Sequence, residues 1–391
     1  MRKCEIMDNF IFSTVADIEF GEGSSSLLGD RISSMGLRNA FIVSDPGILS
    51  LGLMDQALAD LVKHKVEYQI FSKVTADPPE QIVLQAASEL RASECDLVIG
   101  FGGGSSMDVA KIIAVLAKGN QKLEEMYGVD KVTGSRLPLI QIPTTAGTGS
   151  EATMVSIITT GETTKAGVVS RVLLADKVIL DPRLTEGLPP HITAATGVDA
   201  MVHAIEAYTS RRLKNPISDM LARQALELMS KNIETAVNDG SNMIARGAML
   251  LGAMKAGQAF ANAPVAAVHA LAYPLGGNYH IPHGLTNSLV LPHVLRFNLR
   301  DASSMYAELA SIVCDTPDMQ ENDRAASLAL VEYFEELPKR LRLQVSLREM
   351  NIPYEDLPRL AEEAMLQQRL LINNPRELKL ENALEIYKRA F

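Results

Sequence analysis

The chain has 391 residues, of which 47% are hydrophobic, so it is long enough for two domains with sizeable cores. Its formal net charge of −10 and the lack of a long Lys/Arg run argue against nucleic acid as a partner, because phosphate binding needs clustered cations. The first residues form no apolar run typical of a signal peptide, and the longest apolar region, 247–273, is broken by Lys255 and many small residues. We therefore predict a cytoplasmic protein without a membrane span.

The first half of the chain alternates short apolar runs with segments of helical periodicity. Strands are predicted, in chain order, over 39–45, 66–72, 95–101 and 137–143. Helices are predicted between them, over 53–64, 78–93 and 102–117. Strands that are separated by helices pair in parallel, so this half is predicted to form an α/β layer.

Prolines at 182, 189 and 190 mark a change of character, because β signals vanish after them. Helical periodicity then dominates, most clearly over 191–210, 217–237 and 323–342. We place a domain boundary near residue 188. The predicted fold is an N-terminal α/β domain over 1–188 and an all-helical domain over 189–391.

The segment GFGGGSSMDVAK (100–111) joins an apolar strand to a helix through three consecutive glycines. Such a loop lets the backbone approach a phosphate, and the N-terminus of the next helix offers free N–H groups. A plain strand-to-helix turn is the alternative, but it rarely needs three glycines. We interpret the loop as a phosphate-binding loop, although it matches neither G-x-G-x-x-G nor the P-loop pattern.

Asp45, at the end of the first predicted strand, is the best candidate for an acid that binds the adenosine ribose. In the common dinucleotide-binding unit this acid follows the glycines, whereas Asp45 precedes them. The interpretation therefore requires the ends of the two strands to be neighbours in space. A carboxylate at this place repels a 2′-phosphate, so we predict NAD rather than NADP.

A second loop of small polar residues, IPTTAGTGSE (142–151), follows the fourth predicted strand. Thr144, Thr145 and Thr148 offer hydroxyl groups beside flexible backbone, which suits contacts with phosphate, ribose or nicotinamide. A loop that merely turns is the alternative. Both loops follow parallel strands, whose carboxyl ends share one edge of a sheet, so a common ligand crevice is predicted.

The predicted helical domain carries acids and histidines in two segments, GVDAMVHAIEAY (197–208) and AAVHALAYPLGGNYHIPHGLTN (266–287). Asp199 and His203 lie one helical turn apart on the same face. A carboxylate that orients a buried histidine is one interpretation of this pair. The other adds His269, in a predicted helix, and His283, after a predicted Gly-Gly turn, to form a site suited to Fe²⁺, Zn²⁺, Co²⁺ or Mn²⁺. The spacing alone does not decide between them.

These motifs, taken together and in order, resemble the iron-dependent (group III) alcohol dehydrogenase family along nearly the whole chain. The resemblance implies an N-terminal dinucleotide-binding domain, a helical C-terminal domain and an active site between them. The residues that match the four metal ligands of that family are Asp199, His203, His269 and His283. The residues that match its cofactor contacts are Asp45, Gly102, Gly103, Gly104, Ser105, Asp108, Thr144, Thr145, Thr148, Lys165 and Leu184. An exposed hairpin lysine is the alternative for Lys165.

Three positions depart from the pattern of the family. Tyr273 stands where many relatives carry a second histidine for proton transfer, and His280 stands where they carry a smaller polar residue. Asp77 replaces an asparagine that relatives often place near the cofactor. Tyr273 and His280 are therefore the candidate proton-transfer residues, with a core aromatic as the alternative for Tyr273.

The resemblance implies an NAD-dependent oxidoreductase that transfers a hydride reversibly between NAD and an alcohol held by a divalent metal, Fe²⁺ first and Zn²⁺ second. It also implies a small alcohol or aldehyde substrate and a homodimer or larger homo-oligomer. The alternatives are a reductase of keto or hydroxy acids on the same fold, a lyase of the dehydroquinate synthase type, and a nucleotide-binding sensor without chemistry.

Overall fold

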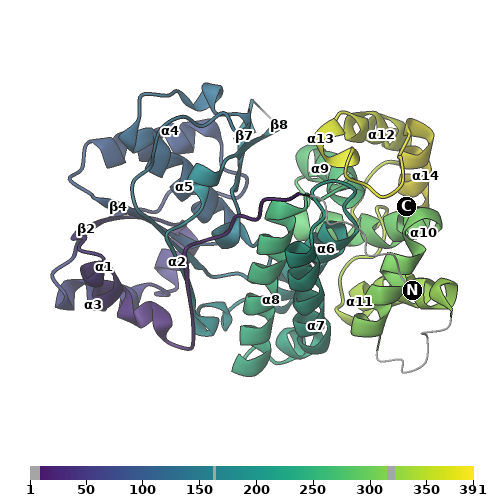
Figure 1. Ribbon diagram of the computed structural model, residues 1–391, viewed down its shortest axis with the longest axis horizontal. Helices are drawn as coiled ribbons and strands as arrows, with labels where there is room; N and C mark the ends of the chain where they lie inside the picture. Colours follow the sequence, from purple (N-terminus) through teal and green to yellow (C-terminus); the bar gives the residue numbers. More distant parts are fainter. Residues whose placement is uncertain (1–8, 162–163, 315–321) are drawn as a thin grey trace.

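The computed structural model describes residues 9–161, 164–314 and 322–391. An α/β domain and a helical domain lie side by side (Figure 1). This architecture confirms the predicted fold class. The boundary near residue 188 stays a proposal; strand β9 ends at Leu180, and helix α6 begins at Pro190.

The main sheet has six strands, and all of its neighbours pair in parallel. Across the sheet the order is β1 (Asp17–Phe20), β9 (Lys177–Leu180), β6 (Leu139–Pro143), β4 (Leu97–Gly102), β2 (Asn39–Val43) and β3 (Glu67–Phe71). The four strands predicted from the sequence are the inner strands β2, β4 and β6 and the edge strand β3. Strands β1 and β9 also belong to this sheet, but the alternation of strand and helix segments did not predict them.

The strands of the main sheet send alternate side chains to two hydrophobic layers, as the period of two in a β-strand requires. On β2, Phe41 and Val43 belong to one layer, and Ala40 and Ile42 belong to the other. Helices α4 (Glu80–Arg91) and α5 (Gly104–Lys118) cover one face, while α1 (Leu28–Ser34) and α3 (Asp55–Lys63) cover the opposite face (Figure 1). The short helix α2 (Pro46–Ser50) follows β2 at the carboxyl edge.

A small second sheet projects from the α/β domain beside the helical domain (Figure 1). It consists of the antiparallel hairpin β7 (Val155–Thr160) and β8 (Thr164–Val169), with β5 (Gly128–Val129) parallel to β8. This hairpin carries Lys165.

The helical domain packs its helices around one continuous hydrophobic core. Its helices are α6 (Pro190–Thr209), α7 (Pro216–Asn238), α8 (Met243–Asn262), α9 (Ala267–Tyr279), α10 (His283–Val313), α11 (Asp323–Arg340), α12 (Leu357–Met365), α13 (Gln368–Leu371) and α14 (Leu380–Ala390). None of the helices within the described ranges is long and apolar enough to cross a membrane.

One local prediction was wrong. Gly276 and Gly277, predicted as a turn, lie inside α9, which ends only at Tyr279. Packing of α9 against α10 and α12 offsets the low helix propensity of the two glycines. The chain turns instead at His280, which has left-handed backbone angles (φ 54°, ψ 29°).

Candidate metal centre

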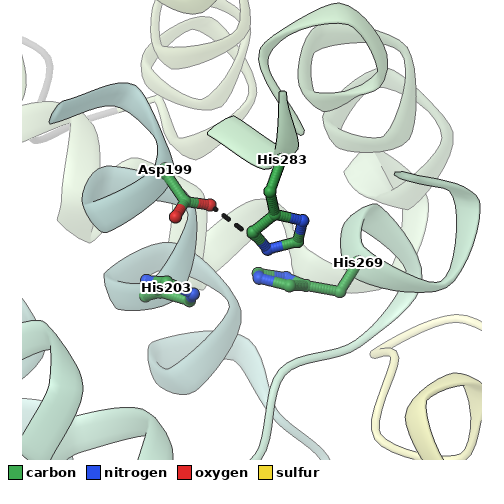
Figure 2. Close-up of side chains that lie close together, drawn as sticks. All are labelled: Asp199, His203, His269 and His283. Atoms are coloured by element: carbon green, nitrogen blue, oxygen red, sulfur yellow. Dashed lines mark ion pairs between the residues drawn. The ribbon is translucent and has the colours of Figure 1, made fainter. Parts of the chain in front are cut away.

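Three helices bring one carboxylate and three imidazoles together, although these residues are spread over more than eighty positions of the chain (Figure 2). Asp199 and His203 come from α6, His269 from α9, and His283 is the first residue of α10. One ligand atom from each residue lies within 4.8 Å of the others. Only His283 is partly open, with 33% of its side chain exposed.

The close approach of α10 to α6 depends on Gly284. A Cβ atom at this position would lie 2.3 Å from the carbonyl oxygen of Ala195, which is far inside van der Waals contact. The absence of a side chain therefore lets the first turn of α10 rest on α6. This contact places Nε2 of His283 3.7 Å from Oδ1 of Asp199.

Glu206, one further turn along α6, fixes the orientation of His269. Its buried carboxylate accepts hydrogen bonds from Nδ1 of His269 at 2.7 Å and from the backbone N–H groups of Ala266 and Val268. Because Nδ1 is occupied, Nε2 of His269 is left with its lone pair toward the cluster. A carboxylate behind a ligating imidazole is the usual partner in protein metal sites.

Asn287 adds a polar contact at the centre of the cluster. Its Nδ2 donates to Oδ1 of Asp199 at 2.5 Å and lies 3.3 Å from Nε2 of both His269 and His283. Nε2 of each of these two imidazoles therefore points to the same small region beside the carboxylate. This convergence fits a single bound cation.

The protonation states also suit a metal. Burial lowers the pKa of His203 to about 3 and that of His283 to about 4, so both imidazoles are neutral near pH 7. Burial opposes ionisation of Asp199, but the neighbouring imidazoles hold the pKa of its carboxyl below the ordinary value. Neutral imidazole and ionised carboxylate are the forms that bind Fe²⁺ or Zn²⁺.

A cavity of about 720 Å³ connects this cluster with the loops of the α/β domain. The four clustered residues line one part of it, and Gly104, Ser105 and Thr148 line another. The remaining wall is largely apolar and includes Phe260, whose ring stacks on His203 with centroids 4.4 Å apart. Such a cavity can hold an elongated ligand that reaches from the glycine loop to the cluster.

The glycine loop lies at the carboxyl end of β4, and no side chain caps the helix α5 that follows it. The first N–H groups of α5 are therefore free to bind an anion. A Cβ at Gly104 would lie 2.8 Å from Cγ2 of Thr148, so the two polar loops are in contact only because this residue is glycine. The two loops therefore lie next to each other, as predicted.

Asp45 lies beside the glycine loop. Strands β2 and β4 pair in parallel, and Oδ2 of Asp45 is 3.5 Å from the place where a Cβ on Gly102 would stand. The other oxygen, Oδ1, caps α2 by accepting from Gly47 and Ile48. One carboxylate oxygen of Asp45 is therefore available to a ligand beside the glycine loop.

The predicted cofactor residues divide into two groups. Residues that line the cavity are Gly104, Ser105, Asp108, Thr148 and Lys165. Residues outside its lining are Asp45, Gly102, Gly103, Thr144, Thr145 and Leu184. Thr144 and Leu184 are buried, and Leu184 packs in the hydrophobic layer on the α1 and α3 side of the sheet.

Asp108 and Lys111, both on α5, connect this helix to the second loop and to the residues just after it. Asp108 accepts from Oγ of Ser150 and from the backbone of Ile157, and burial raises the pKa of its carboxyl. The fully buried Lys111 donates to Ser150, to Thr153 and to a backbone carbonyl. These contacts hold the second loop against α5.

The two candidate proton-transfer residues both line the cavity. Tyr273 lies one turn beyond His269, and its ring centroid is 6.0 Å from that of His283. Burial raises the pKa of Tyr273 above the ordinary phenol value. His280 is exposed at the end of α9.

Sequence reasoning did not identify Glu206, Asn287 or Lys111. Glu206 follows Asp199 by seven residues and Asn287 follows His283 by four, so each shares a helical face with a predicted ligand. That spacing was a usable signal. Lys111 carried none, because an amphipathic helix normally exposes its lysines.

Comparisons with known proteins cover nearly the whole chain. A family model described as iron-containing alcohol dehydrogenase matches residues 16–182, and one described as the Fe-containing alcohol dehydrogenase family, C-terminal, matches residues 193–391. Long-chain-alcohol dehydrogenase 1 of Geobacillus thermodenitrificans is 38% identical over 95% of this chain and 94% of its own. Sulfoacetaldehyde reductase of Bilophila wadsworthia is 36% identical over 98% of this chain and 99% of its own.

Two solved structures show the same fold. The crystal structure of a 1,3-propanediol oxidoreductase superimposes with a TM-score of 0.94 at 33% identity, over 98% of this chain and all of that one. Sulfoacetaldehyde reductase of Bifidobacterium kashiwanohense, in complex with NAD⁺, superimposes with a TM-score of 0.87 at 28% identity, over 98% of this chain and 99% of that one.

Proposed function

This chain belongs to the iron-containing alcohol dehydrogenase family, and on that premise we propose that it transfers a hydride reversibly between NAD and a small alcohol or aldehyde. The observation that carries the proposal is the shared cavity, in which the cluster of Asp199 and three histidines meets an uncapped helix N-terminus. That arrangement supports a metal and a dinucleotide bound in one site.

The proposed ligands of the metal are Asp199, His203, His269 and His283, with Fe²⁺ as the first choice and Zn²⁺ as the second. When bound, the metal supplies a Lewis acid for the substrate oxygen, and NAD supplies the hydride acceptor. The residues of the chain orient these groups. Glu206 holds the His269 ring, and the first turn of α5 is proposed to hold the pyrophosphate.

The proposed site also handles a proton, because oxidation of an alcohol releases one. We propose that His280 passes it to solvent, since this imidazole lines the cavity and is exposed. The raised pKa of Tyr273 keeps its phenol protonated, so Tyr273 is proposed to donate a hydrogen bond rather than accept the proton.

We also propose that two or more copies of this chain assemble. Ile18 and Phe20 lie on the edge strand β1 and are 37% and 47% exposed. An open parallel edge with apolar side chains is a surface that a second copy can cover.

The lyase alternative is disfavoured by the charge of the cavity. A phosphorylated acid substrate would need several free cations, whereas Lys165 and Arg369 are the cationic side chains of the described lining and Lys165 is paired with Asp77. A sensor without chemistry has no use for a four-ligand metal site.

The proposal is tested by loading the protein with Fe²⁺ or Zn²⁺ and following NADH absorbance with a panel of alcohols and aldehydes. We expect turnover that a chelator abolishes and that added metal restores. Binding of NAD without turnover of any substrate would contradict the enzyme assignment and favour a sensor.

Asp45→Gly is expected to raise the NADP-to-NAD ratio of kcat/KM about ten- to hundredfold, because one charge-assisted hydrogen bond is worth about 1.5–3 kcal/mol. Glycine is also tolerated as a helix cap, so α2 should stay folded. The control is Asp55→Asn, at the exposed start of α3. An unchanged ratio would mean that Asp45 does not face the ribose.

A further inference from the structure

Two cationic side chains line the cavity within the described part of the chain, and their surroundings differ. Lys165, on β8, is neutralised by Asp77, with Nζ 2.6 Å from Oδ1. Arg369, on α13, has no carboxylate within ion-pair distance and no side-chain hydrogen bond to any described residue. Among the described residues, no carboxylate therefore neutralises Arg369 on the wall of the cavity.

The guanidinium of Arg369 is directed toward the α/β domain. Its Nη2 lies 3.7 Å from the place where a Cβ on Gly167 of β8 would stand, so the side chain reaches across the gap between the domains. Helices α9 and α13 lie on the side of the helical domain near the β7–β8 hairpin (Figure 1). Arg369 thus lies where a ligand entering between the domains would pass.

Tyr273 connects this position with the metal site. Its ring is 6.0 Å from the ring of His283, measured between centroids. Tyr273, His283 and Arg369 all line the same cavity, so a ligand bound beside Tyr273 occupies a space that Arg369 also borders.

Part of the wall near Arg369 is apolar. Leu370 neighbours Arg369 in the lining, and Val265 and Phe260 extend the apolar part toward His203. A guanidinium offers a planar set of N–H donors that matches carboxylate or sulfonate oxygens. The side chain of Arg369 is exposed and has no carboxylate partner among the described residues, so it can attract an anionic group by its charge as well as by hydrogen bonds, whereas a neutral ligand gains only the hydrogen bonds.

We propose that Arg369 binds an anionic group, a carboxylate or a sulfonate, at the end of the substrate remote from the reacting carbon. The preferred substrates are then short aldehydes or alcohols that carry an acidic group. This inference rests on the proposed function, and it names the substrate class of the same site. Arg369 acts as a specificity-determining residue.

The test compares substrates that differ in charge. The carboxylate pair is 4-oxobutanoate and butanal, and the sulfonate pair is 2-oxoethanesulfonate and propanal. Reduction by NADH is measured with metal-loaded wild type, Arg369→Gln and Arg369→Lys. Arg389→Ala is the matched control, because this arginine pairs with Glu385 on the exposed surface of α14.

For at least one of the two anions, Arg369→Gln should raise KM ten- to hundredfold relative to its effect on the neutral partner, with kcat changed much less. Arg369→Lys should recover part of the loss. The pair that responds identifies the acidic group as carboxylate or sulfonate. Arg389→Ala should behave as wild type.

Three results would overturn the inference. Equal changes of KM for the anion and its neutral partner would mean that Arg369 does not bind a substrate charge. Weaker NADH binding in Arg369→Gln, measured by titration calorimetry, with an unchanged preference between substrates, would place Arg369 on the cofactor. If the metal-loaded wild type oxidised neutral alcohols but reduced none of the four aldehydes, only the inference about Arg369 would be wrong. If it turned over no substrate in either direction, the proposed function would be wrong as well.

Discussion

His269→Ala is expected to lower metal-dependent turnover by about three orders of magnitude or more, because Lewis-acid stabilisation is worth several kcal/mol. The imidazole is one of four converging donors, and its Nε2 is directed to the centre of the cluster by Glu206. NAD binding should be nearly unchanged, because the proposed cofactor loops belong to the other domain. The measurements are NADH turnover, metal content by mass spectrometry and NAD affinity by calorimetry.

His191→Ala is the control for this variant, since His191 is an exposed residue on the same helix as Asp199 and His203. Glu206→Gln should give a milder effect, a loss of about 10- to 100-fold in metal affinity, because an amide holds the ring of His269 less firmly. If His269→Ala retained both its metal and full turnover, Asp199 and His203 would be a buried hydrogen-bonded pair and not half of a metal site.

His280→Asn is expected to lower kcat about a hundredfold, in the range of general acid–base catalysis. Asparagine is chosen because residue 280 has left-handed backbone angles, which asparagine tolerates better than alanine. Because the position is exposed, added imidazole should restore part of the rate.

Tyr273→Phe is the companion variant and is expected to lower kcat less than tenfold, because a buried phenol with a raised pKa stays protonated and contributes only a hydrogen bond. The pH dependence of kcat from pH 6 to 10 separates the two routes. Full activity of His280→Asn beside a hundredfold loss in Tyr273→Phe would assign the proton to the tyrosine.

The sequence by itself determined the local features of this protein. The alternation of apolar runs and helical segments predicted β2, β3, β4 and β6 and the helices between them, because periodicity and length are local properties. The three glycines at the end of β4 predicted a phosphate-binding loop for the same reason. Asp199 and His203 share a helical face whatever surrounds them, so their proximity also followed from spacing.

Only the tertiary structure decided which distant residues act together. Asp45 reaches the glycine loop because β2 pairs in parallel with β4, and His283 reaches Asp199 because Gly284 lets α10 rest on α6. The carboxylate of Glu206 could be placed on the right face of α6, but its partner His269 comes from another helix. Arg369 carried no signal in the sequence, since exposed arginines are common and this one lies in no motif. Its position on the cavity wall results from the packing of α13 against α9, and such contacts between distant segments are not encoded in local periodicity.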